Sequence, residues 1–185
     1  MTEKQKFVPS DLPKFATITH EDISSAVNQQ SAILSKYTAV IRDAALHKDN
    51  PVVVIHAATG SGKSKVLPTL LQETINAPLL CLVTSTVDVV DMFNYAKVDA
   101  SYRMGNRRRG GHDKLRHSEI VFATVGLVLR WYAQHGAQFL SWYGGVLLDE
   151  VADAEHDPCY ALLWEVAMIA TRENKLRCCC LRHNQ

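Results

Sequence analysis

One eight-residue segment, at positions 57–64, constrains the fold of this chain more than any other part of its sequence. It reads A-A-T-G-S-G-K-S, follows the apolar run Val52-Val53-Val54-Ile55 and precedes a stretch that we expect to be helical from about Lys63 to Ile75. A continuous run of β-branched residues is typical of a strand buried on both faces of a parallel sheet. A strand, a glycine-rich turn and a helix in this order begin a βαβ unit, so the segment predicts an α/β fold.

The residue types in this turn are those that bind a phosphate chain. Gly60 and Gly62 let the backbone close around phosphates with its N–H groups pointing inward, and the N-terminus of the following helix adds partial positive charge. Lys63 is long enough to reach the β- and γ-phosphates, and Ser64 can ligate Mg²⁺. The usual pattern begins with glycine where this chain has Ala57. We expect the nucleotide to be bound by Ala58, Thr59, Gly60, Ser61, Gly62, Lys63 and Ser64.

A second candidate segment for the same site is G-G-V-L-L-D-E at 144–150, in which an apolar strand runs into two carboxylates. In a protein with a phosphate loop, Asp149 would hydrogen-bond the water shell of the metal beside Ser64. Glu150 would polarise the attacking water as a general base. We therefore assign Ser64 and Asp149 to the metal, and Lys63 and Glu150 to catalysis.

The rest of the chain continues the alternation of strands and helices. We expect further strands at 79–84, 120–124 and 146–149, and helices at 21–47, 87–96, 125–134 and 161–170. Strands separated by helices of this length predict a mostly parallel sheet with helices on both faces. We expect an N-terminal leader at 1–20, one domain at 21–177 and an atypical tail at 178–185, although the adjacent cysteines at 178–180 favour a buried strand over a set of metal ligands.

Composition limits the classes of protein to which this chain can belong. The 20 basic and 19 acidic residues give a net charge of +1, so a nucleic-acid surface would have to be a local patch. No apolar run approaches the ~18 residues of a membrane span, and the N-terminus lacks the apolar stretch of a signal peptide. Five cysteines, three of them adjacent, do not form a secreted disulfide framework. We expect an intracellular protein, cytoplasmic or nuclear, with no membrane partner.

A dense basic cluster lies between residues 102 and 117, where Asp113 is the one acidic residue. With Tyr102 for base stacking, this cluster suits the phosphates of a single-stranded nucleic acid. A solvated loop explains the cluster equally well, and both interpretations stay open. The basic residues are Arg103, Arg107, Arg108, Arg109, Lys114 and Arg116.

With these motifs placed, the sequence resembles the first RecA-like domain of superfamily-two RNA helicases of the DEAH-box and viral DExH group. The resemblance is carried by T-G-S-G-K-S with Val66-Leu67-Pro68, by I-V-F-A-T-V-G-L-V-L-R at 120–130 and by V-L-L-D-E-V at 146–151. It implies a RecA-like P-loop NTPase domain that binds ATP and Mg²⁺ and couples hydrolysis to RNA or another single-stranded nucleic acid. It also implies that Thr84, Thr124 and Arg130 contact the nucleic acid, although Thr124 could instead cap the helix that follows it.

The sequence departs from the pattern of this family in three places. Ala152 stands where the family has histidine, and the segment at 83–90 lacks the family's Pro-Arg-Arg. We expect a truncated chain without the second RecA-like domain, which in this family carries the arginine fingers, so that the chain is poorly active alone and completed by a second domain in trans. Two other interpretations stay open: a non-enzymatic module that binds nucleotide or RNA, and a P-loop kinase of a small molecule with Arg107–Arg109 as its lid.

Overall fold

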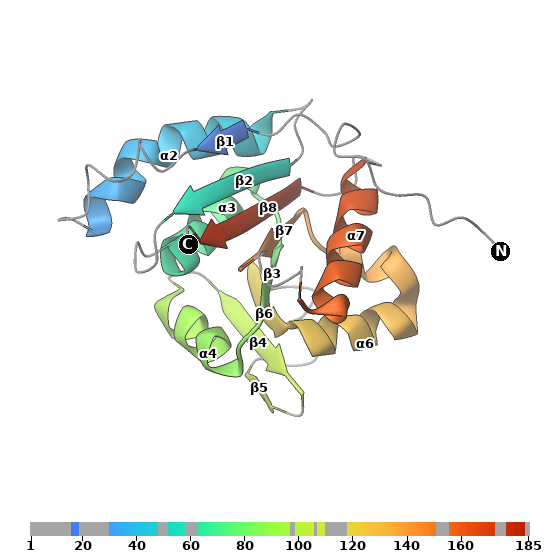
Figure 1. The fold of residues 1–185 in the computed structure, drawn as a ribbon. Coiled ribbons are helices and arrows are strands. Elements are labelled where there is room, and N and C mark those ends of the chain that lie inside the picture. Colours follow the sequence, from blue (N-terminus) through green and yellow to red (C-terminus); the bar gives the residue numbers. More distant parts are fainter. Residues whose placement is uncertain are drawn as a thin grey trace.

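The computed structural model of the chain describes residues 16–18, 30–47, 52–57, 63–96, 99–105, 107–109, 118–150, 156–172 and 177–183. These residues form an eight-stranded sheet in the order β1-β2-β8-β7-β3-β6-β4-β5 (Figure 1). Neighbouring strands are parallel, except that β5 runs antiparallel to β4. The strands are β1 Ala16–Ile18, β2 Val52–Ala57, β3 Leu79–Val83, β4 Ala100–Met104, β5 Arg107–Arg109, β6 Ile120–Thr124, β7 Gly145–Leu148 and β8 Arg177–His183.

Helices cover both faces of the sheet, as the alternation of the sequence predicts. Along β3, Cys81 packs into one hydrophobic cluster while Leu80 and Leu82 pack into the other, because successive side chains of a strand point to opposite faces. The first cluster lies under α2 Gln30–Leu46, α3 Lys63–Ile75 and α4 Thr86–Tyr95. The second lies under α6 Val125–His135, the 3-10 helix η2 Gly136–Trp142 and α7 Pro158–Arg172.

Most element boundaries agree with the sequence analysis to within a few residues. The helix expected from 21 is described from Gln30 onward, and residues 21–29 lie outside the described residues. Helix α7 begins at Pro158, earlier than expected, because proline is tolerated in a first turn and Asp157 supplies a cap: its Oδ1 accepts from the N–H of Cys159 at 2.8 Å. None of the helices in the described part of the chain is long and apolar enough to cross a bilayer.

Both ends of the chain contribute strands where we expected a leader and a tail. Ala16–Ile18 pairs with β2, although the segment around it shows no clear strand pattern. Strand β8 lies between β2 and β7, so residues 178–183 belong to the sheet and not to a separate tail. Cys178 is buried, which agrees with the expectation of a buried strand for the cysteine triplet.

The basic region, for which a solvated loop was one of two interpretations, contains a β-hairpin. Tyr102, Arg103 and Met104 of β4 pair with the three arginines of β5. Gly105 sits in the turn with a positive φ of 52°, a conformation that glycine adopts without steric cost. The hairpin places β5 at the edge of the sheet, which the basic composition alone did not predict.

Candidate functional site

The parallel sheet brings the predicted site residues to one edge, where its strands end. Lys63 begins the helix that follows β2, Thr84 follows β3, and Asp149 and Glu150 follow β7. Because β8 lies between β2 and β7, the ends of these two strands are separated by two strand spacings, about 10 Å. Residues 58–62 lie outside the described residues, so Lys63 and Ser64 are the part of the predicted phosphate loop that the structure places.

Lys63 is buried at this edge and has two acidic neighbours. Its exposed fraction is 4%. Burial lowers the pKa of its ammonium group, while the negative charges of Asp149 and Glu150 act in the opposite direction. A lysine is rarely placed in such a position for packing alone, because burying its charge costs free energy.

The main chain of Asp149 is held by hydrogen bonds at both its N–H group and its carbonyl oxygen. Its N–H donates to the carbonyl oxygen of Leu82 in β3 at 3.1 Å, and its own carbonyl oxygen accepts a hydrogen bond from the hydroxyl of Tyr160 in α7. Its Oδ1 accepts from the N–H of Glu150 at 3.1 Å. The carboxylate is therefore held in one place at the end of β7, and the residue is 5% exposed.

Glu150 has an unusual backbone conformation for a glutamate. Its φ is 54°, in the left-handed region that residues with a Cβ seldom adopt. Its Oε2 accepts a hydrogen bond from Oγ1 of Thr84 at 3.5 Å. A conformation of this kind costs on the order of 1 kcal/mol and persists where surrounding contacts hold it, as they often do at functional sites.

Of the predicted nucleic-acid contacts, Thr84 and Thr124 lie at the ends of the neighbouring strands β3 and β6, where Val83 pairs with Thr124. Thr84 contacts Glu150, and Arg130 is exposed on α6. Thr124 occupies the N-cap position of α6, but its side chain makes no capping hydrogen bond, which contradicts the simple capping interpretation. The main chain of Arg107, Arg108 and Arg109 forms the edge strand β5, and their side chains lie outside what the structure describes.

Arg103 does not lie on the surface with the other predicted contacts. On β4 the ring of Tyr102 packs edge-on against Phe93 of α4, with 5.1 Å between centroids, so Arg103 points to the opposite face. It is 6% exposed. Burial raises the pKa of the Tyr143 phenol, and the positive charge of Arg103 opposes that effect, which places the guanidinium near a buried tyrosine. We therefore leave Arg103 out of the nucleic-acid surface.

The sequence analysis missed Tyr160, whose hydroxyl contacts the Asp149 carbonyl. A tyrosine on the apolar face of a helix gives no sign that its hydroxyl will reach a neighbouring strand end, so no sequence signal was available. The residue lies eleven positions after Asp149, on the far side of a segment that the structure does not describe.

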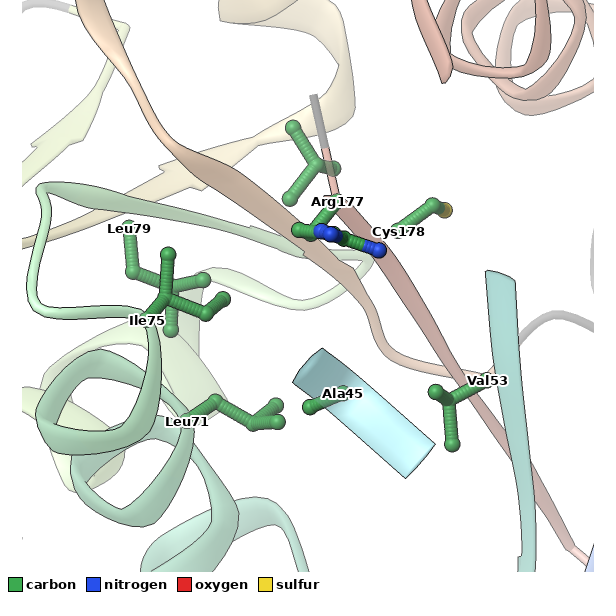
Figure 2. Close-up of a pocket in the computed structure, with 8 residues that line it drawn as sticks. Ala45, Val53, Leu71, Ile75, Leu79, Arg177 and Cys178 are labelled. Carbon is green, nitrogen blue, oxygen red and sulfur yellow. The ribbon is translucent and has the colours of Figure 1, made fainter. Parts of the chain in front are cut away.

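A small cavity of about 10 Å³ lies away from this edge (Figure 2). Apolar side chains line it, among them Ala45, Leu71 and Ile75 from α2 and α3. Arg177 borders it and donates from Nη1 to the carbonyl oxygen of His47 at 2.5 Å, at the C-terminal end of α2. The volume is about that of one water molecule, so this cavity is a packing defect at the amino ends of the strands and not a ligand site.

Comparison with known proteins finds similarity both to a curated sequence and to solved structures. No family model matches the chain. The zinc finger CCCH domain-containing protein 4 of Oryza sativa subsp. japonica is 30% identical over 139 residues, which is 70% of this chain and 13% of that protein. The crystal structure of the Escherichia coli DEAH/RHA helicase HrpB superposes with a TM-score of 0.65 at 21% identity, covering 82% of this chain and 20% of that one. The chain thus has the RecA-like α/β fold, and it spans a small part of both relatives.

Proposed function

We propose that this chain is the ATP-binding RecA-like domain of an ATP-dependent RNA helicase. The observation that carries the proposal is the position of buried Lys63 beside Asp149 and Glu150 at the edge of the sheet where the strands end. Ligands of open α/β sheets bind at this edge. A buried lysine in reach of two carboxylates suits a site that is completed by phosphates and a metal ion.

The donor atoms at this edge suit Mg²⁺. The ion usually takes one or two carboxylates together with substrate phosphates and water. Asp149 supplies a carboxylate with a fixed main chain, and Ser64 supplies a hydroxyl at the start of α3. No cluster of three or more histidine, cysteine or acidic residues that could hold a metal by themselves occurs in the described ranges. Bound Mg²⁺ would neutralise charge on the β- and γ-phosphates.

The remaining residues have separate tasks in the proposed reaction. Lys63 would contact the β- and γ-phosphates, and Thr59, Gly60, Ser61 and Gly62 would surround them with main-chain N–H groups. Glu150 would accept a proton from the attacking water, since its carboxylate is the partly exposed one of the pair. Thr84, Thr124, Arg130 and the arginines of β5 would form the RNA-binding side of the domain. A second RecA-like domain would supply the arginine that stabilises the transferring phosphoryl group.

Nucleotide binding by a variant without the lysine tests the proposal. Lys63→Ala should weaken the affinity for Mg-ATP roughly tenfold to a hundredfold, the effect of losing one charge-assisted phosphate contact. The matched control is Lys65→Ala, because Lys65 is an exposed lysine on the same helix whose ammonium lies 5.8 Å from the ring centroid of Tyr95. Equal affinities in wild type and Lys63→Ala would refute the nucleotide site.

An assay with labelled ATP separates the proposed function from its two alternatives. A hydrolytic domain releases inorganic phosphate, a kinase transfers the label to an acceptor, and a non-enzymatic module binds ATP and does neither. The carboxylate pair after β7 favours water activation, and therefore phosphate release stimulated by RNA.

A further inference from the structure

The turn that carries the carboxylates of Asp149 and Glu150 is held by a hydrogen bond from a residue of α7. Tyr160 is fully buried, and its hydroxyl donates a hydrogen bond to the main-chain carbonyl oxygen of Asp149. The ring itself packs in the second hydrophobic cluster with residues of α6, η2 and β7. We infer that Tyr160 is a positioning residue for the Asp149–Glu150 turn, an inference that rests on the function proposed above.

The first step of the argument concerns the peptide group between Asp149 and Glu150. Its carbonyl oxygen accepts from Tyr160, and its N–H donates to Oδ1 of Asp149 at 3.1 Å. A peptide group is planar, so bonds at both ends fix its orientation about the chain. The orientation of this peptide sets the direction in which the Glu150 side chain leaves the backbone.

The second step concerns the left-handed backbone conformation of Glu150, which these hydrogen bonds help to maintain. Glu150 has a φ of 54°, and a residue with a Cβ tends to leave this region unless its surroundings prevent it. The N–H of Asp149 is fixed to Leu82, so the start of the turn follows the sheet. Beyond that point, the Tyr160 hydroxyl contacts the main chain of the turn from α7.

The third step concerns the choice of tyrosine at this position. Phenylalanine would fill the same space between α7 and the sheet, and would do so without a polar atom to satisfy. A buried phenol needs a hydrogen-bond acceptor, and here the acceptor is the carbonyl of a residue proposed to hold the metal. Through this hydroxyl, the packed position of α7 therefore influences the orientation of the turn that would hold the metal and the attacking water.

The test compares Tyr160→Phe with Tyr143→Phe in the 185-residue chain. Tyr143 belongs to the same cluster and is 3% exposed, but it lies before β7, at the opposite end of that strand. We expect hydrogen exchange at the Glu150 amide, measured by NMR in the free protein, to quicken about tenfold in Tyr160→Phe and not in Tyr143→Phe. This measurement needs no nucleotide.

The second measurement is the Mg²⁺ dependence of binding to a fluorescent ATP analogue. Tyr160→Phe should bind the analogue without Mg²⁺ as wild type does, because Lys63 is untouched. The increase in affinity that Mg²⁺ causes should be about tenfold smaller in this variant than in wild type. Unchanged exchange, or faster exchange with an unchanged Mg²⁺ effect, would overturn the positioning role while leaving the proposed function intact. Absence of nucleotide binding by the wild type would overturn both.

A third variant keeps the inference testable if Tyr160→Phe does not fold. Incorporation of 3-fluorotyrosine at position 160 keeps the ring and the hydroxyl and makes the phenol a stronger donor. A change in the exchange rate of the Glu150 amide relative to wild type supports the inference, and an unchanged rate overturns it.

Discussion

The hydroxyl of Thr84 donates a hydrogen bond to Oε2 of Glu150, at 3.5 Å, between the ends of β3 and β7. Thr84, which we also propose for the RNA-binding side, thus contacts the proposed general base. We expect Thr84→Val, which keeps the shape of the side chain, to slow RNA-stimulated ATP hydrolysis up to about tenfold by loosening the Glu150 carboxylate. Nucleotide affinity should not change, because the substitution leaves Lys63 in place.

Thr84→Ser is the matched control, because it restores the hydroxyl without the methyl group. It should recover most of the hydrolysis rate. A weaker RNA affinity in Thr84→Val, with hydrolysis at saturating RNA equal to that of wild type, would show that Thr84 acts on the nucleic acid and not on Glu150.

Lys63 should make the free protein less stable than it would be with an uncharged residue. Burial lowers its pKa below the usual value of 10.5 by more than Asp149 and Glu150 raise it, so its charged form is disfavoured in the folded state. Lys63→Met, which fills similar space, should therefore retain or raise the thermal midpoint at neutral pH while weakening nucleotide binding as Lys63→Ala does. A marked fall in that midpoint would mean that the lysine stabilises the free protein.

The same shift gives a pH dependence with a definite sign. Between the lowered pKa of Lys63 and 10.5, the unfolded chain binds a proton that the folded chain does not. The contribution of Lys63 to the free energy of unfolding therefore rises with pH across that alkaline window. Denaturant titrations should show that the difference in the free energy of unfolding between Lys63→Met and wild type shrinks or changes sign as pH rises. If wild type instead became still less stable than Lys63→Met as pH rises, the lowered pKa of Lys63 would be contradicted.

Much of the fold could be predicted because apolar runs and their periodicity report burial directly. Helix α3 and strand β6 have the predicted bounds, since each combines a strong pattern with a clear start or stop. The cysteine triplet favoured a buried strand, but β8 was placed outside the domain because its position between β2 and β7 depends on partners distant in sequence. The hairpin of β4 and β5 was missed because a basic segment with glycines also suits a loop.

The candidate site could be predicted to a similar extent. Lys63, Asp149 and Glu150 lie together because strand ends of a parallel sheet share an edge, which follows from the order of elements alone. The contact of Tyr160 with Asp149 depends on how α7 packs, and no pattern in the sequence reports that angle. The burial of Arg103 depends on which residue of β4 faces α4, and a count of basic residues contains no such information.

Gly144 should be needed for the approach of β7 to the end of α3. A Cβ at this position would lie 2.4 Å from Cβ of Ala77 and 3.2 Å from Cγ2 of Ile75. We expect Gly144→Ala to lower the free energy of unfolding by about 1–3 kcal/mol, the usual cost of overpacking. Gly126→Ala is the control, because a Cβ there meets nothing within 4 Å and alanine favours helix α6. Denaturant unfolding should show a loss for the first variant and none for the second.

The arginines of β5 should determine the salt dependence of RNA binding. Neutralising Arg107, Arg108 and Arg109 together should flatten the slope of log affinity against log salt by about two units, at ~0.7 per phosphate for a single strand. The control set consists of three exposed basic residues on α2, α3 and α7, namely Arg42, Lys65 and Arg172. Neutralising these three changes the net charge by the same amount. If the two triple variants flatten the slope equally, the effect is one of net charge. If only the β5 variant does, the edge strand contacts phosphates, and an unchanged slope in both would mean that β5 is a solvated edge and RNA is bound elsewhere.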